Sequence, residues 1–409
     1  MSRLLGTNLV HVKQKNDESI KEVIYKFGPI SRVKIAEMLA LTPPTITSNI
    51  ASLIARGIVE ELSDKENPSD VSLGRKPVKI DFIKSAYYFI GVEMAPGKTI
   101  LCITDLRSNL VSHKVDAAVE HEYDYYVKHV ADTIVEMLAQ AGIKKEKVAG
   151  IGVGVPGFVE SSKGMVRYYG RYGWRDKTLA KDLEELTGIN VVIDNNARVR
   201  IIGEDLLDKK NRPDIFAYYF ISKGIACPLM IRNRMVSGQT SGAGEAGHMV
   251  IEINGKKCET CGNHGCLEAY ASENALLNQC REIMDDKNTI LNDIQSDPGL
   301  LTLDDILSAE AQNDEIIVST VKNVISYLAI ALANIVNLIS PKLVIVDSYI
   351  MKLDINRKYF IQVLKSNLYG LNDTEVEIEF KEYDSLSGAK GAVALAIKKF
   401  FIERVENNQ

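Results

Sequence analysis

The chain of 409 residues is 46% hydrophobic and 25% charged, and its 28 glycines and 11 prolines are too few for a collagen-like or disordered protein. This length exceeds one ordinary hydrophobic core and predicts two or three domains. The net charge of −5 argues against a basic surface over the whole protein, although it leaves room for a local one.

Signals for export or membrane insertion are not evident in the sequence. The N-terminal residues lack the hydrophobic region and small-residue cleavage site of a signal peptide. No apolar run reaches the roughly 18 residues that span a bilayer. We therefore expect a cytoplasmic protein without membrane contact.

Three short helices are predicted before residue 60. Ile20, Val23, Ile24 and Phe27 recur at helical spacing in the first, which ends at Gly28. Ser31 can cap the second helix, in the segment SRVKIAEMLA, because a serine oxygen accepts from a backbone amide in the first turn. The third helix follows in LTPPTITSNIASLIARG, where proline fits the first turn and glycine ends the helix.

The third of these helices has the side chains of a DNA-reading helix. Its apolar residues form one stripe, which leaves short hydroxyl side chains on the opposite side, where they can approach phosphates and base edges in a major groove. The segments GIVEEL and GRKPVKIDF resemble two strands of a wing, whose cations can reach phosphates or the minor groove. The residues expected to contact DNA are Ser31, Arg32, Thr45, Thr47, Ser48, Asn49, Arg75 and Lys76. The alternative is a small docking domain, because amphipathic helices specify no ligand.

From residue 86 onward, apolar strands alternate with helices. The strands are expected in YYFIGVEM, ILCITDL, VAGIGVGVPG, NVVIDNN and AYYFISKG, and this alternation predicts an α/β domain. A second set joins a long apolar helix at 315–339 to a buried strand and predicts a second lobe. Because this helix carries Asn323, Asn334 and Asn337, we interpret it as a buried core or dimer helix and not as a membrane span.

Several stretches together resemble the ROK family of bacterial repressors and sugar kinases. They are ISRVKIAEMLALTPPTITSNIASLIARGIVEE with GRKPVKIDF, GIGVGVPGFVESSKGMV, GWRDKTLAKDLEELTGINVVIDNNA, SGAGEAGHM and CGNHGCLEAYAS. The resemblance implies an α/β protein with a two-lobed, actin-like ATPase (ribonuclease H-like) domain behind an N-terminal winged helix-turn-helix domain. The winged helix is typical of the repressor branch, since family kinases generally lack it.

The resemblance also implies the organisation of the chain and its partners. We expect a winged helix-turn-helix domain over residues 1–82, a first α/β lobe over 83–200 and a second lobe over 201–409 with the cysteine-rich loop and the C-terminal helices. Such a regulator would bind a double-stranded, palindromic DNA operator as a homodimer or a dimer of dimers. It would repress genes of carbohydrate metabolism in response to a sugar or sugar phosphate.

A metal site is predicted around CETCGNHGC. Cys258, Cys261 and Cys266 fall within nine residues, and His248 precedes them by ten, which gives the three thiolates and one imidazole of a structural zinc (Zn2+) site. Two glycines in the loop allow a tight backbone around one ion. His264 is a conceivable substitute ligand, and three reduced core cysteines are the alternative to a metal. The first two cysteines are two residues apart, where the family usually has one.

The family's catalytic base is missing. Family kinases place it as the aspartate of an Asn-Asp pair at a strand end, whereas this sequence has Asn195 and Asn196 there. An amide cannot accept a proton at neutral pH. Asp194 is expected to point away from the position of Asn196 and not to replace the base, because the side chains of a strand alternate between its two faces. Arg198 replaces a small polar residue of the family pattern.

The segments that hold ATP phosphates in the family also differ. The first reads VEMAPGKT, with Glu93 at the acid position and Pro96 near the glycines, and the second, ISKGIACPLM, retains only Gly224. Asp347 and Ser348 stand where paired glycines are expected. We therefore predict that the protein is not an enzyme; the alternative is a ROK-type ATP-dependent sugar kinase.

The sugar contacts that the resemblance implies are largely kept. They are Asn195, Asn196, Glu245, His248 and Glu268, with Gly157 in the turn that shapes the pocket. Polar acceptors and an imidazole suit a polyol, whose hydroxyls must each be paired. Arg198 also makes a phosphorylated sugar conceivable. Alternatively, Glu245 and Glu268 only complete a polar network around zinc.

Overall fold

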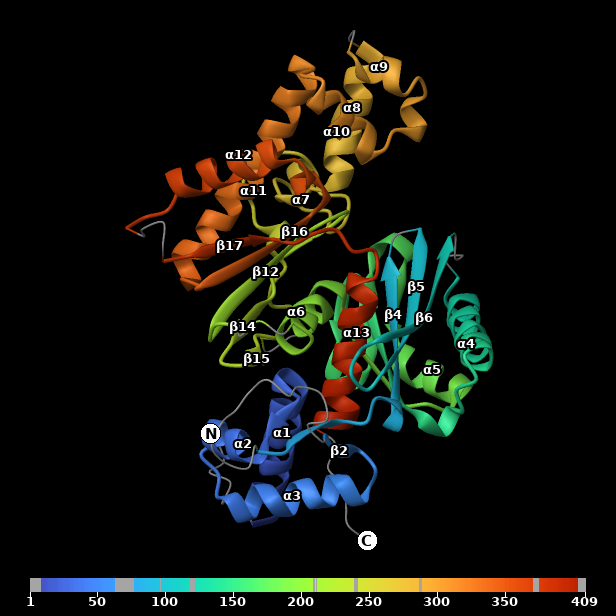
Figure 1. Ribbon diagram of the computed structural model, residues 1–409. Coiled ribbons are helices and arrows are strands. Elements are labelled where there is room, and N and C mark those ends of the chain that lie inside the picture. The colour runs from blue at the N-terminus through green and yellow to red at the C-terminus, as the bar shows by residue number, and fades with distance from the viewer. Residues whose placement is uncertain are drawn as a thin grey trace, which may run out of the picture. The chain divides into compact units, whose positions relative to one another are not determined.

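The computed structural model describes residues 9–62, 77–95, 97–117, 122–208, 210, 212–238, 242–286, 289–370 and 375–403. The chain divides into two compact units. Unit 1 comprises Met1–Arg167, Asp176–Asn211 and Leu386–Gln409, and unit 2 comprises Tyr168–Arg175 and Arg212–Ser385. The chain therefore returns to unit 1 after completing unit 2, as the red segment α13 in Figure 1 illustrates.

Unit 1 begins with helices α1 (Leu9–Phe27), α2 (Arg32–Leu39) and α3 (Pro43–Ala55). They are followed by a hairpin of β2 (Val59–Leu62) and β3 (Lys79–Phe82), and β1 (Ile30–Ser31) pairs with the other side of β3. This N-terminal region is shown in blue in Figure 1. The loop of the predicted wing, with Arg75 and Lys76, lies outside the described residues.

The three helices predicted in the N-terminal region are present, and the structure shows which of their predicted caps and buried residues occur. Ser31 is the N-cap of α2, and its hydroxyl oxygen accepts a hydrogen bond from the backbone amide of Lys34 at 3.3 Å. Thr42 stands at the N-cap of α3 without a capping hydrogen bond from its side chain. In α1, Phe27 is exposed and not part of the buried stripe, whereas its neighbour Tyr25 is buried because Ser108 and Arg107 pack against it.

The main sheet of unit 1 has the strand order β11-β7-β4-β5-β6. Its strands are β4 (Tyr88–Ala95), β5 (Lys98–Asp105), β6 (Leu110–Ala117), β7 (Val148–Val155) and β11 (Val191–Asn195). Its helices are α4 (Tyr123–Gln140), α5 (Leu179–Thr187), α6 (Asn196–Leu206) and α13 (Ser387–Ile397), the last continued by a π-helical turn, η8 (Lys398–Ile402). Figure 1 shows α6 and α13 on one side of the sheet and α4 and α5 on the other.

Close backbone contact fixes α13 on the sheet. A Cβ atom on Gly152 of β7 would lie 1.8 Å from the carbonyl oxygen of Ala392 in α13, so a glycine is required there. Gly91 of β4 is equally close to the backbone of Ala389. A small sheet has the order β10-β9-β8 and is formed by β8 (Phe158–Glu160), β9 (Met165–Tyr169) and β10 (Trp174–Lys177).

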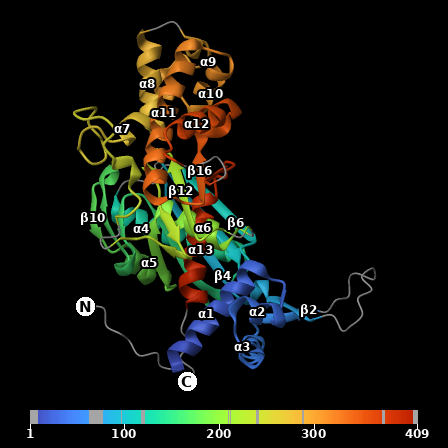
Figure 2. The same ribbon diagram turned by 90° about the vertical axis from the view of Figure 1, so that its left-hand side faces the viewer.

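Unit 2 contains a sheet with the order β15-β14-β12-β16-β17, and β13 also pairs with β12. The strands are β12 (Ile215–Ile221), β13 (Ile225–Ala226), β14 (Leu229–Ile231), β15 (Arg234–Met235), β16 (Leu343–Ser348) and β17 (Glu377–Phe380). The helices are α7 (Glu268–Ala271), α8 (Glu273–Asp286), α9 (Leu291–Ile294), α10 (Leu303–Ala311), α11 (Glu315–Ile339) and α12 (Asp354–Ser366). Figure 2 shows α8, α9 and α10 grouped beside α11.

Short 3-10 helices connect these elements in both units. They are η1 (Lys84–Ala86), η2 (Lys145–Lys147), η3 (Ser161–Lys163), η4 (Gly170–Tyr172), η5 (Ala246–His248), η6 (Pro298–Leu300) and η7 (Tyr349–Lys352).

Helix α11 is long and apolar enough to cross a membrane by length and composition alone. Its side chains nevertheless pack into the core of unit 2, where Val321, Ile325, Leu328 and Leu332 are fully buried. Removing apolar side chains from water in the protein interior stabilises such a helix. The predicted interpretation as a core helix therefore agrees with its surroundings.

Candidate functional site

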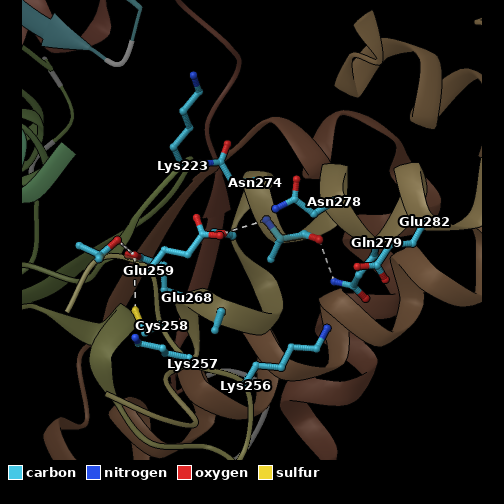
Figure 3. A pocket seen from close by; sticks show the side chains of 14 residues that line it. Lys223, Lys256, Lys257, Cys258, Glu259, Glu268, Asn274, Asn278, Gln279 and Glu282 are labelled. Atoms are coloured by element: carbon cyan, nitrogen blue, oxygen red, sulfur yellow. Dashed lines mark hydrogen bonds between the residues drawn. The ribbon is translucent and has the colours of Figure 1, made fainter. Parts of the chain in front are cut away.

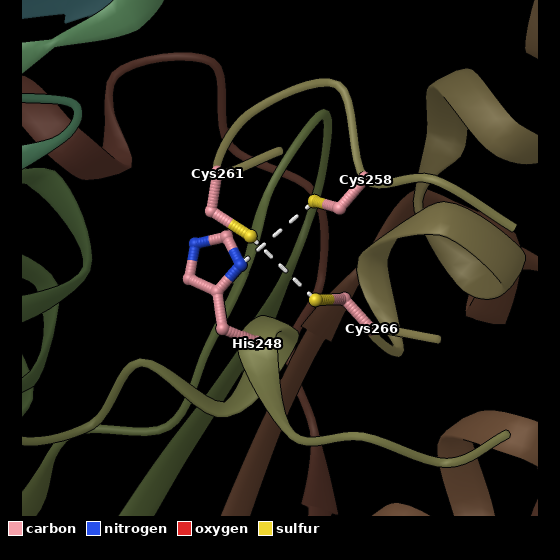
Figure 4. A group of neighbouring side chains, drawn as sticks. All are labelled: His248, Cys258, Cys261 and Cys266. Atoms are coloured by element: carbon pink, nitrogen blue, oxygen red, sulfur yellow. Dashed lines mark hydrogen bonds between the residues drawn. The ribbon is translucent and has the colours of Figure 1, made fainter. Parts of the chain in front are cut away.

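The four predicted metal ligands come together in unit 2. Their ligand atoms all lie within 4.8 Å of one another, and Figure 4 shows the side chains pointing toward a common centre. The Sγ atom of Cys258 is 3.9 Å from Nδ1 of His248, and Sγ of Cys261 is 3.6 Å from Sγ of Cys266. A tetrahedral ion with sulfur at ~2.3 Å requires sulfur atoms roughly 3.8 Å apart. The geometry therefore fits a metal of the zinc class.

The loop backbone explains how three cysteines converge. Gly262 and Gly265 both have φ of 79°, a conformation that other residues rarely adopt. A Cβ atom on Gly265 would also lie 1.8 Å from the carbonyl oxygen of Glu252. His264, the alternative imidazole ligand, is exposed and has its Nδ1 3.0 Å from the carbonyl oxygen of Gly255, outside the group of four. His248 is thus the imidazole that the fold supplies.

The predicted sugar-binding residues of unit 1 lie where β11 ends and α6 begins. Asn195 caps α6: its side-chain oxygen accepts from the amide of Ala197 at 2.9 Å. Its side-chain nitrogen donates to the carbonyl oxygen of Gly157 at 2.9 Å, so the structure brings these two predicted residues together. Asn196 is the first residue of α6 and is half-buried.

The predicted sugar-binding residues of unit 2 lie around the metal group. The hydroxyl of Thr260 donates to Glu268 Oε1, which is also 4.0 Å from Sγ of Cys258. Glu268 therefore contacts the cysteine loop, as the alternative of a polar network around the metal requires. Glu245 directly precedes the short helix that carries His248 and is half-buried.

A cavity of about 230 Å³, which the sequence did not predict, opens beside the cysteine loop within unit 2. Lys256, Lys257 and Glu268 line one side of it, and the α8 side chains Asn278 and Glu282 line the other (Figure 3). Its lysines and glutamates balance in charge. No local motif marks this cavity, because its walls come from separate segments.

The carboxylate of Asp194, which precedes Asn195 and Asn196, is held in a buried ion pair. Asp194 Oδ1 lies 3.3 Å from Nη1 of Arg198, and it accepts a hydrogen bond from the backbone amide of Asn195 at 2.7 Å. Burial raises the pKa of Asp194, and the Arg198 guanidinium and the hydrogen bonds oppose that rise. Arg198 also donates to the carbonyl oxygen of Val159 at 3.4 Å. Each of the two side chains therefore provides the buried counter-charge of the other.

A second buried ion pair stands at the predicted first phosphate segment. Glu93 Oε1 is 2.5 Å from Nη2 of Arg200, and both side chains are buried. The glutamate carboxylate also packs on Gly388, where an added Cβ would lie 2.1 Å from Glu93 Cδ. Sequence reasoning identified Glu93 but missed Arg200, whose partner is 107 positions away. At the third segment, Tyr218 donates a hydrogen bond to Asp347 at 2.6 Å.

The predicted DNA contacts on α3 differ in their surroundings. Thr47 and Ser48 are exposed. Thr45 is half-buried, its hydroxyl lies 2.9 Å from that of Thr42, and its carbonyl oxygen accepts from the Asn49 side chain at 2.8 Å. The side chains of Thr45 and Asn49 therefore make hydrogen bonds within α3 and to its N-cap residue.

At the start of α2, Arg32 pairs with Glu61 of β2 at 2.6 Å, across the N-terminal region. Ser31 is engaged as the N-cap of the same helix. Arg75 and Lys76, the two predicted contacts of the wing, are outside the described residues.

Comparison with known proteins gives a consistent assignment. The xylose repressor of Bacillus subtilis is 29% identical over 378 residues, which cover 92% of this chain and 90% of that protein. A solved ROK family transcriptional regulator, a homologue of the Escherichia coli Mlc protein, has a TM-score of 0.81 at 23% identity and covers 96% of this chain and 98% of its own. A ROK family glucokinase from Streptomyces griseus has a TM-score of 0.64 at 23% identity, but it covers 75% of this chain and 98% of its own. The model of the ROK family matches residues 89–399, and the chain therefore belongs to the ROK family.

Proposed function

We propose that this protein is a sequence-specific, DNA-binding transcriptional repressor whose ROK domain binds a sugar and carries out no phosphoryl transfer. The observation that carries the proposal is the N-terminal region, in which α3 presents Thr47 and Ser48 to solvent beside a hairpin. Short hydroxyl side chains on an exposed helix suit phosphate and base contacts in a major groove. A relative that matches the chain over nearly its full length is named a repressor.

The absence of phosphoryl transfer is supported by the two buried ion pairs. A kinase needs a general base for the sugar hydroxyl and a cradle for the ATP phosphates. Asn196 cannot act as the base, and Asp194 is committed to Arg198. Glu93, at the first phosphate segment, is committed to Arg200. Incubation with ATP and a panel of sugars tests this point, and measurable phosphorylation would favour the kinase alternative.

We assign the metal group to a structural zinc ion held by His248, Cys258, Cys261 and Cys266. A full set of protein ligands leaves no open coordination position for a substrate, which is the mark of a structural zinc. When bound, the ion would cross-link the cysteine loop to the segment of Glu245 and His248. The loop then supports the sugar-binding residues of unit 2.

The effector is proposed to be a monosaccharide, with D-xylose as the first candidate because of the name of the Bacillus subtilis relative. The sugar-phosphate alternative would require Arg198 to leave Asp194, since the two side chains are paired. The proposed assembly is a homodimer or a dimer of dimers, which matches the two half-sites of a palindromic operator. DNA as the target implies a cytoplasmic location.

The decisive experiment is selection of a binding sequence from a random duplex library with the full chain. We expect enrichment of one palindromic sequence, and a Thr47→Ala, Ser48→Ala variant should bind it at least about tenfold more weakly. Ser366→Ala, an exposed serine of α12 in unit 2, is the matched control and should bind as the wild type does. Failure to enrich any sequence would refute the proposal.

A further inference from the structure

Strand β6 forms one edge of the main sheet of unit 1. It is eight residues long and pairs with β5 along one side, and it is the longest edge strand in the part of the chain that the structure describes. No described strand pairs with its other side. An edge of this length presents a row of backbone amides and carbonyl groups that can pair with a further strand. The sheet can therefore be extended at β6.

One face of β6 leaves apolar side chains in contact with solvent. Val111 and Val115 are 45% and 49% exposed, and Leu110 at the start of the strand is 44% exposed. His113 lies between the two valines on the same face and is also exposed. Soluble proteins usually protect a long edge strand with charged side chains or a covering element. This face of β6 carries no lysine, arginine, aspartate or glutamate, and its valines stay half-exposed.

The opposite face of β6 carries the charged side chains of the strand, and α4 engages both of them. Lys114 Nζ lies 3.2 Å from the carboxylate of Glu136 in α4. Asp116 Oδ2 lies 3.1 Å from Nε2 of His129 in the same helix. Both charged side chains therefore have partners within the chain, and a strand added at the edge does not need to supply any.

A second copy of β6 fits this edge in a defined register. Two identical antiparallel strands are related by a twofold axis normal to the sheet. Because side chains paired across a sheet lie on the same face, this axis places one residue opposite its own copy. A centre at His113 pairs residues 110–116 with one another, and a centre at Lys114 pairs residues 111–117; other centres give a shorter overlap of β6. The centre at Lys114 sets two lysines opposite each other, and directly opposed like charges are destabilising.

The register centred on His113 matches the apolar side chains of the two copies. Val111 of each copy lies opposite Val115 of the other, and this pair occurs twice because the contact is twofold symmetric. Cross-strand pairs of β-branched side chains stabilise a sheet. On the face toward α4, Ser112 of each copy lies opposite Lys114 of the other, so no like charges are directly opposed. The exposed strips of the two strands thus cover each other.

We propose that two copies of this chain associate edge to edge through β6, in the antiparallel register centred on His113, so that their two five-stranded sheets form one continuous sheet. Two paired strands bury less than the roughly 1,200 Å² of a standard interface, so the association depends on protein concentration. The proposal names a contact that the proposed homodimer or dimer of dimers leaves open. It requires neither the proposed DNA binding nor the proposed sugar binding, and its test contains neither ligand.

Disulfide cross-linking of the full-length protein tests the register. In His113→Cys the two new cysteines lie opposite each other with Cα atoms about 4.5–5.5 Å apart, which is within the range of a disulfide. Oxidised glutathione should therefore convert most of this variant to a covalent dimer on a non-reducing gel. In Val115→Cys the two cysteines are offset by about 13 Å along the strands, and this variant should stay at the wild-type background.

Val135→Cys, an exposed valine of α4 in the same unit, is the matched control for cross-linking by chance collision. It should also stay at the wild-type background. No covalent dimer of His113→Cys at chain concentrations up to about 100 μM would overturn the proposal. Preferential cross-linking of Val115→Cys would overturn the register.

Sedimentation equilibrium measures the same contact without added cysteines. Val111→Lys combined with Val115→Lys sets lysine opposite lysine at both cross-strand pairs, and it should halve the mass that the wild type reaches at high concentration. Val135→Lys adds a lysine at a valine that is 56% exposed, and it should keep the wild-type mass. Urea unfolding should show the wild-type midpoint for the double variant, because both β6 valines are half-exposed. A folded double variant with the wild-type mass would contradict the proposal.

Discussion

The guanidinium of Arg198 lies 3.3 Å from the carboxylate of Asp194 at the end of β11, where both side chains are buried. An ionised carboxylate is costly to bury without a partner, and here the partner comes from the next turn of the chain. The ion pair therefore explains features of both residues. It accounts for an arginine in a buried helix, and it provides the buried carboxylate that precedes Asn195 with a counter-charge.

Replacing Arg198 with methionine should destabilise the protein by about 3–5 kcal/mol, because the buried Asp194 loses its partner. The loss should depend on pH. Burial raises the pKa of Asp194, and without the arginine that pKa rises further above its value in the unfolded chain. A raised folded-state pKa favours folding at low pH, so the deficit is smallest near pH 4 and grows as pH rises.

Urea unfolding of Arg198→Met at several pH values measures this effect, and the double variant Asp194→Asn, Arg198→Met is its control. The double variant should recover most of the stability and should lose the pH dependence, because no buried charge remains. A deficit in Arg198→Met that is constant between pH 4 and pH 8 would show that Asp194 is not the cause.

Cys261→Ser should lower zinc content and operator affinity together, since the loop that the ion would close supports unit 2. Zinc per chain is measured by elemental analysis and operator affinity by titration of the selected duplex. His264→Ala is the matched control, because His264 lies in the same loop but outside the group of four. Equal zinc loss in both variants would argue for the alternative ligand set.

Local signals in the sequence were sufficient for much of the fold and for the metal group. Ser31 caps α2 as predicted, because a capping oxygen and its amide partner are three residues apart in the chain. The four predicted ligands, from His248 to Cys266, likewise lie within one short segment, and closely spaced thiolates with glycines at tight turns are typical of a structural metal site. In such cases residue type and spacing determine the geometry.

Contacts between distant segments could not be predicted in this way. Glu93 and Arg200 pair over 107 positions, and Lys21 donates to Phe401 over 380. The sequence does not show which distant segment will supply the partner of a glutamate or lysine that becomes buried on folding. The same limit hid the return of the C-terminal helix to unit 1. The burial of Tyr25 in place of Phe27 depends on Arg107, which helical periodicity does not include.

Arg107→Ala should destabilise the attachment of α1 by roughly 2–3 kcal/mol, because hydrogen bonds from a charged donor to three carbonyl oxygens are lost. Hydrogen exchange of the α1 amides is the appropriate measurement, since it reports local opening. Lys114→Ala, which breaks a more exposed ion pair with Glu136 in the same unit, should leave this exchange unchanged. Unaltered α1 exchange in Arg107→Ala would mean that the anchor holds α1 only weakly.

Two glycine substitutions at the contact between α6 and α13 should differ in their effect on stability. Gly391→Ala places a Cβ 2.5 Å from a backbone oxygen that cannot move aside, and it should destabilise the protein by about 1–3 kcal/mol. Gly203→Ala meets its nearest atom at 3.2 Å and gains up to about 1 kcal/mol in helix propensity, so its net effect should be small. Urea unfolding measures both. Wild-type stability in Gly391→Ala would show that the two helices are packed less tightly than these distances indicate.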